Sequence, residues 1–107
     1  MRDRPLYYVL DGDGVPLAVD DVLVWADWFK TAERRVALDY VGKSRVSTVF
    51  LGIDHGFAGA PLLFETMIFD DDESKLDLAC WRYSTRAEAL AGHADALAAL
   101  HARATYS

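Results

Sequence analysis

The side chains that could act on a ligand gather in the middle of the chain, where two apolar stretches flank a loop. Asp54 and His55 are adjacent at the start of this loop, and a neighbouring carboxylate can orient an imidazole and favour its protonated form. Thr48 and Gly52 precede them, and Glu65 follows in the second apolar stretch. We therefore predict a ligand-binding edge built from these five residues.

The same residues fit a catalytic or a metal site less well. A general base would need His55 within hydrogen-bond reach of Asp54 or Glu65, yet adjacent residues on an extended strand point apart. A metal site needs about three suitable ligands, and neither His93 nor His101 has a recognised ligand spacing. We predict no catalytic residue, no metal and no cofactor, and rank a small hydrolase with His55 as its base below any binding role.

The elements that must position these residues can be read from periodicity and turn chemistry. We expect strands at residues 6–10, 15–18, 36–41, 46–53, 62–69 and 78–83, and helices at residues 21–31 and from 85 to about 103. Thr85 and Glu88 have the spacing of a capping box, which should begin the second helix. The fold class is then α+β, one domain over residues 1–107, with a four- to five-stranded antiparallel meander and two helices.

Alternation along the strand 46–53 predicts which sheet face meets the helices. One face carries Val46, Thr48, Phe50, Gly52 and Asp54, and the other carries Ser47, Val49, Leu51 and Ile53. The second face is more uniformly apolar, so we expect it to be covered and the Thr48 side to be open. On the second helix, the strip expected to cover the sheet is Leu90, Ala94, Leu97 and His101, with Leu100 beside it.

The charge of the chain bears on its partners. Its formal net charge is −6, and acidic residues cluster at Asp70, Asp71 and Asp72. Nucleic-acid binding depends on clustered Lys and Arg, so we expect no direct nucleic-acid contact and a basic protein as the charged partner. Trp25 and Trp28 exceed what one narrow helical stripe needs, and with the acidic cluster they form the predicted partner-binding set. These aromatics and an open sheet edge also predict a symmetric homodimer.

The cysteine count and hydropathy indicate the cellular setting. Cys80 is the only cysteine, so no intramolecular disulfide can form, and no leader-like pattern begins the sequence. The longest apolar runs are far shorter than the roughly 20 residues of a membrane-spanning helix. We therefore expect a cytoplasmic protein with no membrane contact.

The segments 45–55 (RVSTVFLGIDH) and 61–67 (PLLFETM) resemble small proteins of an uncharacterised family encoded by tailed phages and bacterial prophages, mostly of high-GC hosts. The likeness extends more loosely from Trp25 to about His93. It implies a phage accessory setting in the host cytoplasm and assigns no reaction.

Two functions follow as hypotheses. The first is a non-enzymatic accessory protein that binds a host or phage protein and inhibits or redirects a host system. The second is a protein that binds or sequesters a small, nucleotide-like ligand at the predicted edge.

Overall fold

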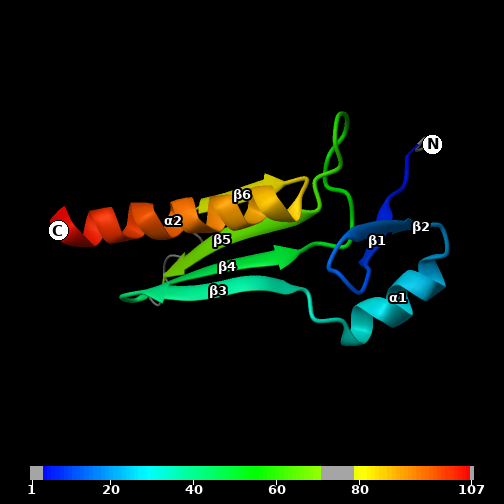
Figure 1. Ribbon diagram of the computed structural model, residues 1–107, viewed down its shortest axis with the longest axis horizontal. Helices are drawn as coiled ribbons and strands as arrows, with labels where there is room; N and C mark the ends of the chain where they lie inside the picture. Colours follow the sequence, from blue (N-terminus) through cyan, green and yellow to red (C-terminus); the bar gives the residue numbers. More distant parts are fainter. Residues whose placement is uncertain (1–3, 71–78, 107) are drawn as a thin grey trace.

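The computed structural model describes residues 4–70 and 79–106, and it has an α+β fold, as predicted (Figure 1). In chain order the elements are β1 (Tyr7–Leu10), β2 (Pro16–Val19), α1 (Val22–Thr31), β3 (Arg35–Val41), β4 (Ser44–Phe50), β5 (Phe64–Asp70), β6 (Ala79–Tyr83) and α2 (Arg86–Tyr106). The strands form two antiparallel sheets, a β1–β2 hairpin and a four-stranded meander in the order β3-β4-β5-β6. The predicted meander and both helices are therefore confirmed.

The register of the meander fixes which side chains share a face. Val46 pairs with Ile68, Thr48 with Thr66, and Phe50 with Phe64, so these six side chains point to one side of β4 and β5. All six are buried. Helix α2 contacts all four strands, and its Ala96 and Leu100 pack against Val46 and Ile68. The buried side of the meander is therefore the side that α2 covers.

The predicted choice of sheet face is wrong. The Val46–Thr48–Phe50 face lies under α2, whereas Ser47 and Val49 lie on the other face and are only half-buried. Among the described elements no helix covers that other face: α2 packs on the Val46 face, and Trp28 of α1 contacts Phe50 on the same face. The wrong face was predicted because threonine counts as a polar residue in the alternation of apolar and polar positions. A threonine hydroxyl can nevertheless be buried when it is hydrogen-bonded.

The predicted strip of α2 is right only for Leu97, which packs against the core, and for Leu100 beside it, which is buried. The buried residues of this helix are Ala89, His93, Ala96 and Leu100, whereas Leu90 is 45% exposed. Small side chains let the helix approach the sheet closely, so burial follows size and hydrogen bonding more than hydrophobicity. The capping box is confirmed: the Glu88 amide donates to Thr85 Oγ1 at 3.1 Å, and the Thr85 amide donates to Glu88 Oε1 at 3.0 Å.

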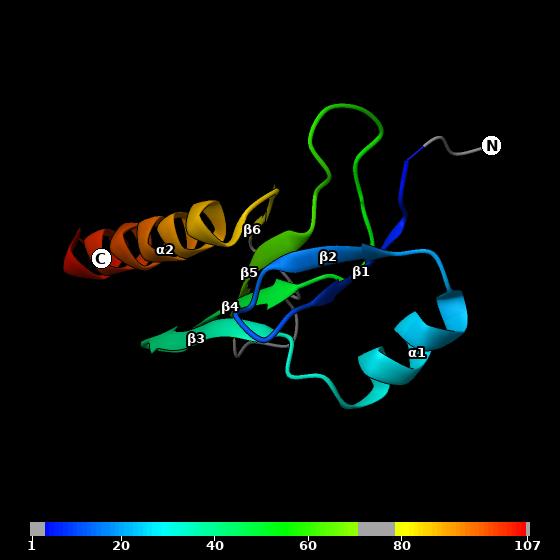
Figure 2. The ribbon, with the colours of Figure 1, turned by 45° about the vertical axis from the view of Figure 1, so that its right-hand side comes forward.

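The N-terminal hairpin and α1 pack at one end of the meander (Figure 2). Asp21 caps α1, and its carboxylate accepts from the Leu23 amide at 2.9 Å. Trp25 and Trp28 are both half-buried: the Trp25 ring lies 4.9 Å from Tyr7, and the Trp28 ring lies edge-on to Phe50 at 6.0 Å. The two indoles pack α1 against the rest of the fold, and each side chain remains only partly exposed.

A glycine allows α2 to pass close to β6. Gly92 lies in the interior of α2, where glycine is unfavourable by about 1 kcal/mol relative to alanine. A Cβ atom on Gly92 would overlap the phenol of Tyr83, at its Oη and ring carbons. Close approach of Tyr83 therefore explains a residue that helix propensity disfavours.

We expect Gly92→Ala to lower the free energy of unfolding by about 1–3 kcal/mol, because the overlap with Tyr83 outweighs the gain in helix propensity. Urea unfolding of this variant and of Gly92→Ala combined with Tyr83→Ala measures the effect. The added methyl should cost less in the Tyr83→Ala background than in the wild type. A stabilised Gly92→Ala single variant would contradict the packing described here.

Candidate binding site

The loop between β4 and β5 projects from the end of the meander (Figures 1 and 2). Its first turn is held by the buried carboxylate of Asp54, whose Oδ1 accepts from the Gly56 amide at 2.7 Å and from the Leu62 amide at 3.0 Å. These two bonds join the beginning and the end of the loop. Asp54 is therefore a structural clamp and not an open ligand contact.

Arg4 completes the clamp from the N-terminal segment. Its Nε donates to Asp54 Oδ2 at 2.7 Å, its Nη2 donates to the same oxygen, and its Nη1 donates to the Gly59 carbonyl at 2.8 Å. Burial raises the pKa of the Asp54 carboxyl, but the Gly56 amide, the Arg4 guanidinium and the Leu62 amide together bring this pKa below its usual value. Asp54 is thus held ionised, and one arginine ties the loop to the chain terminus.

The clamp presents an apolar loop tip to solvent. Phe57 is fully exposed, at 101% relative accessibility, and His55, Ala58 and Ala60 are exposed around it. No charged side chain lies between Asp54 and the end of the loop at Leu63. An isolated exposed aliphatic side chain is ordinary. A fully exposed phenylalanine on an anchored loop leaves a large apolar surface in water, and a partner that buries this surface gains favourable free energy. This loop was predicted from the sequence but Phe57 was not, because an aromatic residue in an apolar stretch is typical of a core.

Gly52 is buried at the base of the same loop and has no room for a ligand. Its φ of +78° favours glycine, and a Cβ there would lie 3.1 Å from Phe29 Cε2. Its carbonyl oxygen accepts from Trp25 Nε1 at 3.0 Å. The close approach that its missing side chain permits is made by aromatic residues of α1.

Thr48 belongs to a buried polar chain that joins the meander to α2. Its Oγ1 lies 2.6 Å from Thr66 Oγ1 and 2.7 Å from His93 Nδ1, and His93 Nε2 lies 2.8 Å from Asp39 Oδ2. An acid, an imidazole and a hydroxyl in sequence resemble a hydrolytic triad in composition. Here, however, Thr48 is completely buried in the middle of a strand, so a substrate has no access to its hydroxyl. This series of buried hydrogen bonds fixes the position of α2 on the sheet.

The remaining predicted site residues do not converge. Glu65 lies within the β4–β5 ladder opposite Val49, and its Oε2 accepts from Arg82 Nε at 2.9 Å and from the Cys80 thiol at 3.2 Å. His55 is exposed beyond the end of the ladder, and its amide donates to the Leu62 carbonyl oxygen. The structure therefore does not bring Asp54, His55 and Glu65 together as one site.

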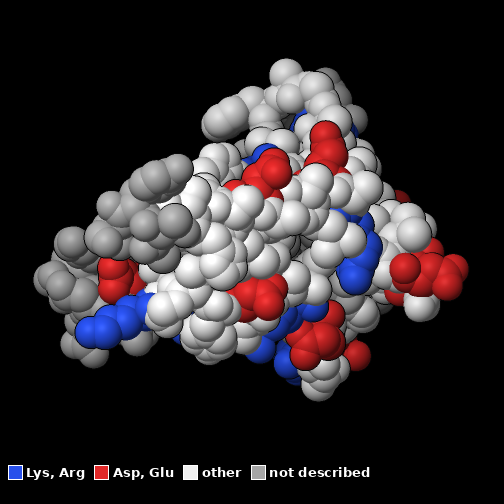
Figure 3. Space-filling view, turned by 60° about the vertical axis from the view of Figure 1, so that its left-hand side comes forward, with Lys and Arg blue, Asp and Glu red and all other residues white. Residues whose placement is uncertain are grey.

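The predicted acidic contact set is only partly visible. Asp70 is half-buried at the end of β5, and Asp71 and Asp72 lie outside the described residues. On the face shown in Figure 3, charged side chains of both signs form small separate groups between broad areas of other residues. That face presents no continuous acidic surface.

The described residues contain neither a group that could bind a metal nor a helix that could span a membrane. No group of three or more His, Cys, Asp or Glu side chains in residues 4–70 and 79–106 is placed to hold a metal ion. No helix in this part of the chain is long and apolar enough to cross a membrane. No family model, curated protein or solved structure matches the chain.

We expect Asp54→Asn to lower the free energy of unfolding by about 2 kcal/mol at pH 7, because it leaves Arg4 facing a neutral amide. Because the pKa of Asp54 is lower in the folded state, its contribution is complete above the unfolded pKa of about 3.9 and is lost as pH falls through the folded pKa. The difference between wild type and variant should therefore shrink below about pH 4.

Urea unfolding at a series of pH values measures this dependence. The exposed helix residue Asp27 supplies the control Asp27→Asn, which should change the free energy of unfolding by less than about 0.5 kcal/mol at pH 7. An Asp54→Asn deficit that persists unchanged at the lowest pH would show that the ion pair is not its cause.

We expect Thr48→Val to destabilise the fold by about 1–3 kcal/mol, because it leaves Thr66 and His93 without their shared buried partner. The triple change Thr48→Val, Thr66→Val and His93→Leu should recover most of this loss, because it removes the buried polar groups together. Chemical unfolding of the single and triple variants distinguishes the two. If the triple variant is less stable than Thr48→Val, the buried hydrogen bonds contribute to the free energy of unfolding beyond satisfying one another's polar groups.

Proposed function

We propose that this chain is a non-enzymatic binding protein of a phage or prophage, and that it captures a macromolecular partner in the host with the loop between β4 and β5. The observation that carries the proposal is Phe57, a fully exposed aromatic side chain on a loop clamped at both ends. The resemblance of segments 45–55 and 61–67 to phage proteins supports the setting.

The physical basis is preorganisation. Ordering a flexible loop on binding costs free energy, so a loop already held by main-chain bonds to Asp54 retains more of the energy of each new contact. Aromatic residues that fill a pocket on the partner dominate the affinity of many interfaces. The side chains beside Phe57 at the tip are those of alanine and glycine, which suit an apolar cavity. The partner in this proposal is therefore a protein with a hydrophobic pocket that accepts Phe57.

The proposal differs from the sequence hypothesis in the surface it uses. Trp25 and Trp28 serve the packing of α1, and Asp54 serves the loop, so neither indole nor carboxylate is available as a primary contact. Binding of a small ligand by Thr48 and Gly52 is not favoured, because both residues are buried among neighbours that already contact them.

A photo-crosslinking amino acid in place of Phe57 tests the proposal in lysates of high-GC bacterial hosts. We expect a discrete adduct from position 57 and none from the matched position Tyr40, an aromatic residue that is 65% exposed on β3. Unlabelled wild-type protein should suppress the adduct at concentrations at least about tenfold lower than Phe57→Ala requires, which is about 1.4 kcal/mol of binding energy.

The stability of Phe57→Ala supplies the folding control, since replacing a fully exposed side chain should change the free energy of unfolding by less than about 0.5 kcal/mol. Equal labelling from positions 57 and 40, or equal competition by wild type and Phe57→Ala, would overturn the proposed role of the loop.

A further inference from the structure

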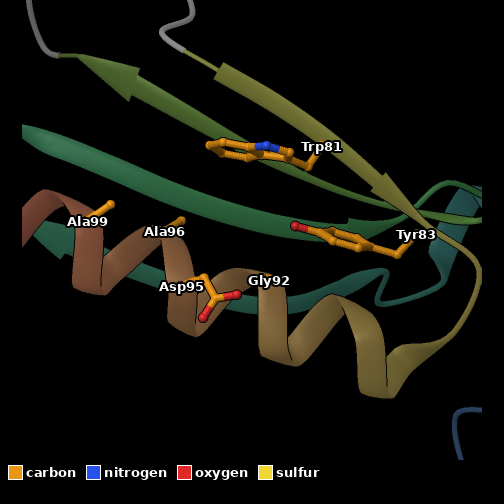
Figure 4. A pocket seen from close by; sticks show the side chains of 6 residues that line it. All are labelled: Trp81, Tyr83, Gly92, Asp95, Ala96 and Ala99. Carbon is orange, nitrogen blue, oxygen red and sulfur yellow. The ribbon is translucent and has the colours of Figure 1, made fainter.

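A second surface, remote in sequence from the loop, has the form of a recognition groove. It lies between the edge strand β6 and helix α2 and encloses about 250 Å³ (Figure 4). Trp81 and Tyr83 project from β6 toward the helix, and Gly92, Ala96 and Ala99 form the opposite wall. Ordinary ligand pockets have volumes of about 300–1,000 Å³, so this groove is slightly smaller than that range and has room for a side chain of a partner.

The residues that line the groove suit a positively charged side chain. Among the described residues, its lining combines two aromatic rings with one charged group, the exposed carboxylate of Asp95, and includes no lysine or arginine. Trp81 is 45% exposed, so the indole is accessible to a ligand. Aromatic faces attract cations, and a carboxylate adds a charge-assisted hydrogen bond. The formal net charge of −6 favours the approach of a basic partner.

The strand beside the groove favours an extended occupant. In the described part of the chain β6 pairs only with β5, at register positions such as Thr66 with Trp81 and Glu65 with Arg82. Alternate residues of an edge strand direct their N–H and C=O groups away from the sheet, where an added strand can pair with them. An added strand places every second side chain on the same face as Trp81, toward α2.

We propose that the groove binds an extended basic segment of a partner protein, which pairs with the edge of β6 and inserts an arginine or lysine side chain between Trp81 and Asp95. Main-chain hydrogen bonds supply affinity in this mode of recognition, and the pocket supplies specificity. The site is independent of Phe57, so one surface can fail its test while the other passes.

The probe for this site is the acetylated and amidated peptide Thr-Val-Arg-Val-Thr, titrated into the full chain and followed by amide chemical shifts. We expect saturable shifts in β6 and in α2 near Gly92 and Asp95, with affinity at least about tenfold greater than for the same peptide carrying citrulline, the neutral analogue of arginine. A lysine peptide should bind between the two, because ammonium lacks the planar fork of guanidinium.

Variants separate the charge from the groove itself. Asp95→Asn should reduce the preference for arginine over citrulline by about tenfold and leave citrulline binding unchanged. Ala99→Trp should fill the groove and abolish binding of every peptide, whereas Ala94→Trp, on an exposed position of α2 outside the groove lining, should not. Phe57→Ala should bind the arginine peptide as the wild type does.

Four results would overturn the proposal. The first is the absence of chemical-shift changes at β6 up to about 2 mM arginine peptide, and the second is equal affinity for the arginine and citrulline peptides. The third is an Asp95→Asn variant that still prefers the arginine peptide over the citrulline peptide as strongly as the wild type does. The fourth is binding of methylguanidinium alone as tightly as the arginine peptide. The last result would assign the groove to small free cations. None of these results bears on the crosslinks from position 57, so the two surfaces are tested separately.

Discussion

The buried carboxylate of Asp54 is the interaction on which the functional end of this fold depends. It accepts hydrogen bonds from amides at both ends of the β4–β5 loop and pairs with Arg4 of the N-terminal segment. Without an ionised acceptor at this point, two partly buried amides and a guanidinium would lose their shared partner. One side chain therefore closes the loop, attaches the start of the chain and determines where Phe57 is presented.

The packing at the other end of the molecule depends on how closely α2 can approach the meander. His93 links the helix to Thr48 on the central strand β4 and to Asp39 on the edge strand β3, while Gly92 admits the ring of Tyr83. Hydrogen bonds fix the position of the helix and small residues fix its distance from the sheet. The groove beside Trp81 is a consequence, since a helix held over the strands leaves an open side at the edge strand β6.

Local signals in the sequence were sufficient to predict the elements and their order. The cap at Asp21, the capping box of Thr85 and Glu88, and the turn-forming glycines are interactions over a few residues, so they are visible without tertiary structure. The meander was predicted from four strands that follow one another along the chain, and each pairs with the next. The N-terminal strands formed a separate hairpin sheet instead of a fifth strand of the meander.

Faces and site residues could not be predicted, because they depend on partners distant in sequence. Thr48 and His93 are 45 residues apart, and only their hydrogen bond makes burial of either favourable. Asp54 and Arg4 are 50 residues apart, so their ion pair is not evident from the sequence. The carboxylate that was predicted to contact a ligand is bound to this arginine instead. Phe57 is exposed because the loop is held away from the core. The residue type alone does not indicate this exposure.

The order of the loop backbone tests the central claim, that Asp54 holds a rigid platform for Phe57. Backbone ¹⁵N relaxation of the full chain should give order parameters of about 0.85 for the amides of Gly56 to Gly59, similar to those of rigid secondary structure. Order parameters below about 0.6 at these residues would contradict the account, because the loop would then be flexible despite the clamp.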